Sequence, residues 1–237
     1  MKSAQRAVPG VSLVVLWPKK VAAGPIVEQL LRRLSERRLS STWAIEDPAQ
    51  AAVLYSPGKT PTVDLALGVN SVADPADEIE RGLGRFSAAG KSIVAIQAGA
   101  ALPRGSVERR LCQAGVRAIV GPSIRASASI IRPLPFGLWE LAAHIKAPAP
   151  SRLNLFGRRP RDLFPAAGQS PSIASIDLGR VSSTASRAWQ AVERLVDHAA
   201  EACAHGKARN MSIAEIVAEL SDSAAARPQR SILRMAA

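Results

Sequence analysis

Apolar, β-branched runs of strand length alternate along the chain with longer segments whose apolar residues recur at helical spacing. Runs of this length, bounded by glycine, proline or polar residues, are typical of buried strands. They predict strands at 11–16, 41–45, 63–67, 92–97 and 115–120, and one or two more extended pieces within 130–141. A last strand is expected at 173–181.

The segments between these runs carry the start signals of helices. Pro25 suits a first helical turn, and Asp47 and Asp74 each combine a capping side chain with a following proline. Ser106 is expected to cap a further helix. Near the C-terminal end, the periodicity predicts helices at 183–205 and 213–220.

This alternation, at intervals of roughly 25 residues, predicts a mainly parallel sheet. The expected class is α/β, as a distorted parallel β/α barrel. An open doubly wound sheet is the alternative, which the number of strands slightly disfavours. Residues 11–222 are expected to form one domain, with an N-terminal tail at 1–10 and a mobile tail at 223–237. The proline- and arginine-rich stretch 147–169 is expected to be a long surface loop.

Composition supports a globular core and excludes a membrane span. Hydrophobic residues make up 47% of the chain and aromatic residues 4%, so small and branched aliphatic side chains must build the core. No apolar run approaches the roughly 20 residues that cross a bilayer. The short first run is interpreted as a strand rather than a signal peptide. The two cysteines have no paired spacing, which favours free thiols and a cytoplasmic protein.

The net charge of +12 makes the protein strongly basic. Such a balance attracts phosphate backbones and other anionic surfaces. The basic residues are mostly arginines scattered along helices, however, and no run is long enough for a basic tail. A nucleic-acid partner is therefore an alternative that the sequence does not favour.

Candidate catalytic residues are few. His198 and His205 lie two helical turns apart, too far for one metal ion, and His144 stands alone. The chain has neither a glycine-rich phosphate loop nor a G-x-S-x-G elbow. Lys19 and Lys20 follow the first strand, where α/β proteins bind ligands, and either hold an anion or form a solvated loop.

Several pieces of the chain, taken together, are similar to one known family. The first helix ends in a basic turn before the strand with Thr42-Trp43, and Ala89-Gly90-Lys91 precedes the fourth strand. With 63–68, 115–119 and the last strand and closing helix at 176–189, these pieces span 11–220. In this order the chain resembles the polysaccharide deacetylase (NodB-homology) family. The resemblance implies a NodB-like distorted β/α barrel and a function in carbohydrate metabolism.

The chain departs from this family where the family keeps its chemistry. The family binds a divalent metal with an Asp after the first strand and two His after the third. Here Trp17-Pro18-Lys19-Lys20 and Gly68-Val69-Asn70 stand there, and Gln97-Ala98-Gly99 replaces the motif after the fourth strand. Lysines where a carboxylate is needed repel a cation. We therefore expect no metal, no other cofactor and no catalytic residue of the family type.

The expected function is that of a degenerate, deacetylase-like pseudoenzyme that binds a glycan or a protein partner. One alternative is a hydrolase of carbohydrate N-acetyl groups with another acid–base pair, such as Glu46 with His144. The other is a basic protein that binds anions or nucleic acid. The two tryptophans among the candidate ligand-binding residues either stack on sugar rings or lie in the core. These candidates, at strand ends, are Trp17, Lys19, Trp43, Glu46, Asn70 and Gln97.

Overall fold

The computed structural model describes residues 8–55, 62–70, 74–99, 102, 105–122, 131–143, 145–147 and 171–225. Within them the predicted alternation of strands and helices is confirmed. His144 lies outside the described residues. Of the expected surface loop 147–169, only residue 147 is described. The strands are β1 (Gly10–Trp17), β2 (Ser41–Ile45), β3 (Val63–Val69), β4 (Ala95–Ala98), β5 (Ala118–Pro122), β6 (Ile131–Pro133), β7 (Trp139–Ala143), β8 (Ile145–Ala147), β9 (Ser172–Asp177) and β10 (Arg209–Asn210).

The helices begin at the capping residues and prolines that the sequence displays. The Asp47 carboxylate accepts the Ala49 N–H, and the Ser186 hydroxyl accepts the Trp189 N–H. Each cap satisfies a backbone donor that has no partner within its helix. The helices are α1 (Pro25–Glu36), α2 (Pro48–Leu54), α3 (Pro75–Ala88), α4 (Ser106–Gln113), α5 (Arg187–Ala204) and α6 (Ile213–Ala225).

The strand order shows a sheet wound in one direction. It runs β6-β7-β5-β4-β3-β2-β1-β9-β8, and β10 pairs with the start of β1. All pairs are parallel except β6 with β7. From β1 to β5 each new strand is added on the same side, so right-handed crossovers place the connecting helices on one face. A doubly wound sheet would reverse direction, so the barrel prediction is confirmed and the open-sheet alternative is wrong.

One segment of chain joins the two ends of this curled sheet. β7 pairs with β5, and β8, which begins two residues after β7 ends, pairs with β9. β7 also contacts β9 directly. β7 and β8 therefore pair with opposite sides of the sheet, which curls into a distorted barrel with its seam between them.

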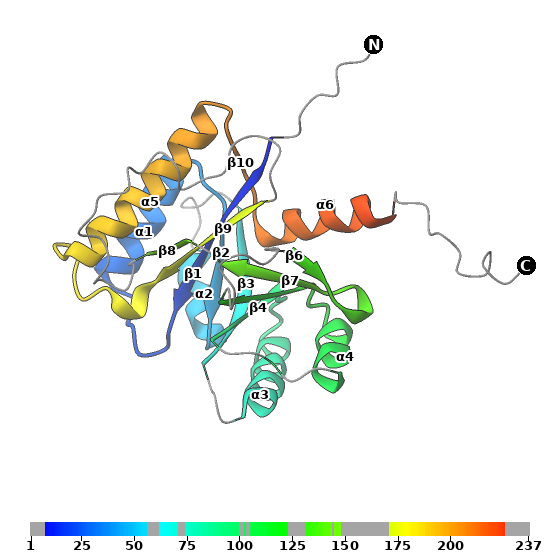
Figure 1. The fold of residues 1–237 in the computed structure, drawn as a ribbon. Coiled ribbons are helices and arrows are strands. Elements are labelled where there is room, and N and C mark those ends of the chain that lie inside the picture. Colours follow the sequence, from blue (N-terminus) through cyan, green and yellow to red (C-terminus); the bar gives the residue numbers. More distant parts are fainter. Residues whose placement is uncertain are drawn as a thin grey trace, which may run out of the picture.

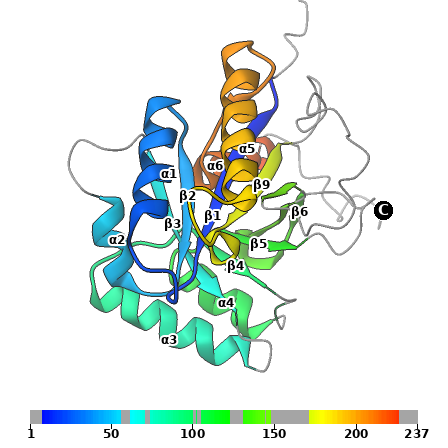
Figure 2. The same cartoon turned by 90° about the vertical axis from the view of Figure 1, so that its left-hand side faces the viewer.

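The two faces of the sheet are packed differently. The outward side chains of β1, such as Leu13 and Val15, share one apolar cluster with α1 to α5. The inward Val14 belongs to a second cluster with Ala44, Ala66 and the first turns of α6. Figure 1 shows α1 and α5 together on one side of the sheet, with α6 apart from them. Figure 2 shows α3 and α4 completing the outer layer.

Helix α6 closes the barrel at the amino ends of the strands. Its first residue, Ile213, is fully buried among the inward side chains. Inward polar side chains accept hydrogen bonds from its first backbone N–H groups. The Ile213 N–H donates to Thr42 Oγ1 and the Ala214 N–H donates to the Asp64 carboxylate, both at 3.2 Å. Asp64, a carboxylate within a strand, thus caps a helix.

Some predicted boundaries shift. Gly105, with φ of +87°, precedes α4 at its N-terminus, so Ser106 is the first helical residue and not its cap. The last large strand ends at Asp177, because its carboxylate turns the chain into a short 3-10 helix, η3 (Leu178–Arg180). The short strands β8 and β10 were not predicted, since three or fewer residues carry no periodicity. Among the described residues, no helix has the length and apolar character that a bilayer crossing requires.

Candidate functional site

A cavity of about 750 Å³ opens at the carboxyl ends of the barrel strands. We call this the mouth cavity. Strand alternation explains its lining, because every second side chain points inward. The inward residues change from small or apolar at Ala44, Ala66 and Ala95 to polar at the strand ends. The lining residues are Leu16, Trp17, Pro18, Lys19, Lys20, Ala44, Glu46, Gly68, Asn70, Gln97, Asp177, Gly179 and Arg180.

Glu46 and Asn70 form one wall of the mouth cavity as a hydrogen-bonded pair. Asn70 Nδ2 donates to Glu46 Oε1 at 2.6 Å, and the Lys19 backbone N–H donates to Oε2 at 3.2 Å. Both carboxylate oxygens of Glu46 therefore accept hydrogen bonds from neighbours. The pair links the ends of β2 and β3, and the bond to Lys19 adds the loop after β1, so the wall is built before any ligand arrives.

Gln97 lies at the floor of the mouth cavity, at the end of β4. It is 7% exposed, and its Oε1 is buried without a hydrogen-bond partner among the residues that the structure describes. Its Nε2 makes only a long contact, 3.5 Å, with the carbonyl of Ala98. A buried acceptor without a partner costs free energy in the unliganded protein. Gln97 is therefore placed to receive a donor from a ligand.

The opposite wall comes from the turn after β9. Asp177 Oδ1 accepts the Gly179 N–H at 2.9 Å, and Oδ2 accepts Arg180 Nε at 3.0 Å. Gly179 brings this turn close to the loop after β1, since a Cβ there would lie 3.2 Å from Pro18 Cγ and 3.7 Å from Lys20 Cε. The loops after β1 and β9 thus pack against each other at the rim.

Asp47, just outside this lining, fixes the start of α2 beside Lys19. It accepts the Ala49 N–H and lies 3.5 Å from the Lys19 ammonium. The hydrogen bond from Ala49 lowers the pKa of Asp47, burial partly opposes this, and the charge of Lys19 adds to it. The expected role of Asp47 as a helix cap is confirmed.

Replacing Asp47 with Ala should lower the free energy of unfolding by about 1 kcal/mol at pH 7, because α2 loses its N-cap. A carboxyl group with a lowered folded pKa stabilises the protein above its unfolded pKa of about 3.9. This stabilisation is lost as the pH falls through the folded pKa. Urea unfolding should therefore show a smaller difference between wild type and D47A at pH 3 than at pH 7. The exposed Asp222, replaced in the same way, is the control; a defect independent of pH would contradict the assignment.

The two candidate tryptophans pack against each other. Their rings lie edge to face, with centroids 5.9 Å apart, and both are buried to within 1% exposure. Trp17 Nε1 donates to the Val21 carbonyl and Trp43 Nε1 to Ser41 Oγ. Trp43 is not in the cavity lining and has no free ring face, so it belongs to the core. Trp17, in contrast, is one of the residues that line the mouth cavity.

The structure brings five of the six candidate residues to one cavity, namely Trp17, Lys19, Glu46, Asn70 and Gln97. Asp177 and Arg180 were missed, although the end of β9 next to β1 is where such a barrel adds its last wall. Ile176-Asp177-Leu178-Gly179 at the end of the predicted strand was the available signal. The alternative pairing of Glu46 with His144 concerns a residue outside the described ones.

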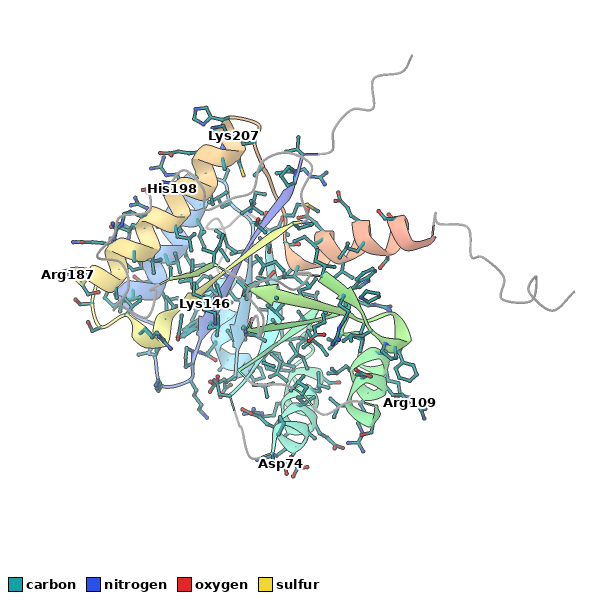
Figure 3. The ribbon with its side chains drawn as sticks, in the orientation of Figure 1. Asp74, Arg109, Lys146, Arg187, His198 and Lys207 are labelled. Atoms are coloured by element: carbon teal, nitrogen blue, oxygen red, sulfur yellow. The ribbon has the colours of Figure 1, made fainter. Side chains whose placement is uncertain are left out.

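The remaining histidines and the cysteines lie away from the mouth cavity. His198 in α5 and His205 at its C-cap each hydrogen bond through Nδ1 to a carbonyl one turn earlier, of Arg194 and Glu201 respectively, both at 2.7 Å. Figure 3 shows His198 on the outer side of α5. Both cysteines are free, and burial raises the pKa of Cys203, which makes it a poor nucleophile.

The mouth cavity does not suit the divalent metal that the resemblance to polysaccharide deacetylases implies. Glu46 and Asp177, its two carboxylates, are already engaged by neighbouring donors, and three cationic side chains share the lining. Across the described parts of the chain, no group of three or more His, Cys, Asp and Glu side chains is placed to hold a metal ion. Cationic neighbours raise the cost of placing a further cation there.

This chain resembles known proteins at the level of the fold. The sequence matches no protein-family model and has no significant similarity to a curated protein. Two solved structures share the architecture, each at 10% identity over 90% of this chain. One is a Bordetella bronchiseptica protein described as a polysaccharide deacetylase involved in O-antigen biosynthesis, with a TM-score of 0.50 and 90% of its own length covered. The other is 4-alpha-glucanotransferase from Thermococcus litoralis, with a TM-score of 0.54, of which 38% is covered. The chain therefore shares a distorted β/α-barrel fold with these solved structures, and at this identity the likeness extends to the fold alone.

Proposed function

We propose that this protein is a deacetylase-like barrel of carbohydrate metabolism that binds a glycan in the mouth cavity without metal-dependent deacetylation. Both solved structures that share the fold carry names of proteins acting on carbohydrate. The cavity lies at the carboxyl ends of the strands, where barrels of this kind place their ligands. Its walls present amide, carboxylate and ammonium groups, which match sugar hydroxyls.

The buried amide oxygen of Gln97 is the observation that carries the proposal. A buried amide oxygen without a partner, on the floor of a cavity of about 750 Å³, is costly unless something binds it. A sugar hydroxyl or acetamido N–H supplies the missing donor. The neighbouring Glu46–Asn70 pair adds further polar atoms at a fixed geometry.

The side chains at the strand ends support the part of the proposal that excludes metal-dependent deacetylation. Hydrolysis of an N-acetyl group by a metal requires the ion to polarise the carbonyl and acidify a bound water. The loop after β1 presents Lys19 and Lys20 instead of a ligand for such an ion. Glycan binding by this protein should accordingly be insensitive to chelators.

The nucleic-acid alternative receives less support from the surface. Several arginines of the described residues are paired with carboxylates, which reduces the positive charge that they present to an anionic partner. Arg33 pairs with Glu193 and Asp197, and Arg110 pairs with Glu80 on a neighbouring helix. Three further pairs are Arg132–Glu140, Arg180–Asp177 and Arg209–Glu219.

The test compares wild-type protein with Q97L on an array of neutral and acidic oligosaccharides, with and without EDTA. Wild-type protein should bind a defined set of glycans in the presence of EDTA. Q97L should bind the same glycans with an affinity at least tenfold lower. The unfolding temperature of Q97L should equal or exceed that of wild type, because leucine needs no hydrogen-bond partner. A variant that loses binding while gaining stability is the signature of a binding residue.

Gln113→Leu is the matched control, since Gln113 is exposed at the last residue of α4. It should bind the same glycans as wild type. Failure of wild type to bind any arrayed glycan, or equal binding by Q97L, would overturn the proposal. Deacetylation of a bound glycan that EDTA abolishes would overturn its second half.

A further inference from the structure

The polar groups that line the mouth cavity divide into those already used and those left open. Glu46 and Asp177 have both carboxylate oxygens occupied by donors from the protein. Arg180 is held by Asp177, and the Lys19 ammonium lies 3.5 Å from Asp47. Each of these carboxylate oxygens already shares its charge with a protein donor, so a group without any partner is the stronger candidate for binding a ligand.

Two polar groups of the lining, which differ in kind, have no partner among the residues that the structure describes. One is the buried Gln97 Oε1 at the floor. The other is the ammonium of Lys20, which makes no ion pair with any residue that the structure describes. Lys20 lies at the rim, with its stem along the turn at Gly179. These two open groups are thus a buried acceptor and an exposed cation.

We propose that the ligand of the mouth cavity is an anionic sugar, with a hydroxyl or amide N–H donated to Gln97 and a carboxylate or phosphate held by Lys20. This inference rests on the proposed glycan-binding function and names its substrate class. An uncharged sugar would fill the floor but leave the Lys20 charge without a counterion. A free anion would meet Lys20 but leave Gln97 Oε1 buried without a donor.

The charge around the cavity favours such a ligand. Three cationic side chains and two carboxylates line the cavity, and both carboxylates already accept hydrogen bonds from the protein. The net charge of +12 adds a long-range attraction for anions. Lys19 and Arg180 line the same cavity as Lys20, although each of them is paired with a carboxylate. In a partly enclosed site this attraction is screened less than at an open surface.

The experiment uses matched sugars that differ in one group: glucose, glucuronate and glucose 6-phosphate, and likewise galactose and galacturonate. Titration calorimetry of the full-length protein should give at least tenfold tighter binding for an acidic sugar than for its neutral partner. Lys20→Gln should remove this preference, so that the acidic sugar binds no more tightly than its neutral partner. Preference for the carboxylate or for the phosphate member identifies which anion Lys20 holds.

Lys207→Gln is the control, because Lys207 is exposed beyond the C-terminal end of α5 (Figure 3) and should leave every affinity unchanged. Equal binding of neutral and acidic sugars would overturn this inference while the proposed glycan binding stands. Inorganic phosphate that binds as tightly as glucose 6-phosphate would overturn the sugar half. Glycan binding that is missing altogether on the array would instead defeat the proposed function itself.

Discussion

Replacing Ile213 with Asp should lower the free energy of unfolding by about 3–5 kcal/mol, because it places a carboxylate inside the closed end of the barrel. Ile213 is fully buried and packs in the inner cluster with Val14 and Ala44. The carboxylate of Asp64, which receives the Ala214 N–H, would repel the new charge nearby. A buried carboxyl has a raised folded pKa, so the defect should shrink as the pH falls and the group becomes protonated. Urea unfolding followed by circular dichroism at pH 7 and pH 4 measures both effects.

Ala218→Asp provides the matched control on the same helix. Ala218 is exposed, so the same new side chain meets water there, and its cost should stay below about 1 kcal/mol. The first turn of a helix normally favours a negative charge. Destabilisation of I213D must therefore come from burial and not from helix formation. Equal stability of the two variants would show that α6 does not close the barrel as described.

Replacing Trp43 with Ala should cost about 3–5 kcal/mol, the range for removal of a buried large aromatic side chain. Trp43 is fully buried, its ring meets Trp17 edge to face, and its Nε1 is the donor to Ser41 Oγ. Loss of the indole leaves a cavity, removes the aromatic contact and leaves the Ser41 hydroxyl without this partner. In a chain of this size such a loss lowers the unfolding temperature by roughly 6–20 °C. Scanning calorimetry measures it.

Trp43→Phe separates these contributions, since it keeps most of the apolar volume and loses the hydrogen bond. It should cost clearly less than W43A. Tyr55→Ala is the exposed control: Tyr55 is 47% exposed and rests against Lys91 in a cation–π contact, which at exposed sites is worth about 0.5–1 kcal/mol. If W43A were no more destabilising than Y55A, Trp43 would not be part of the core, and sugar stacking would have to be considered again.

Much of this fold could be predicted from the sequence because local signals and global arrangement agree. The prolines after Asp47 and Asp74 set the starts of α2 and α3 at the expected residues. Apolar runs marked β1, β2 and β3 because strands of a parallel sheet are buried on both faces. The seam was hidden, because β8 has three residues, and its pairing with β9 joins positions about 30 residues apart.

The candidate site was predicted in part for a related reason. Strand ends are visible in sequence, and Glu46, Asn70 and Gln97 follow from them once the strands are parallel. The character of each residue was not visible. The saturation of Glu46 by Asn70 and Lys19, and the open Oε1 of Gln97, depend on contacts across three different strands and loops. Asp177 looked like an ordinary strand residue until its carboxylate ended β9.

The closure of one end of the barrel by α6 has a consequence for how this protein can change. The contacts that hold α6 at the amino ends of the strands involve Ile213, Thr42 and Asp64, while the mouth cavity lies at the carboxyl ends of the same strands. Substitutions in the loops at the mouth therefore leave these α6 contacts intact, and distant sites of this kind contribute to stability almost independently. The scaffold can exchange one ligand for another, or gain and lose a reaction, at little risk of unfolding. A barrel built in this way is a suitable starting point for directed evolution of new carbohydrate specificities.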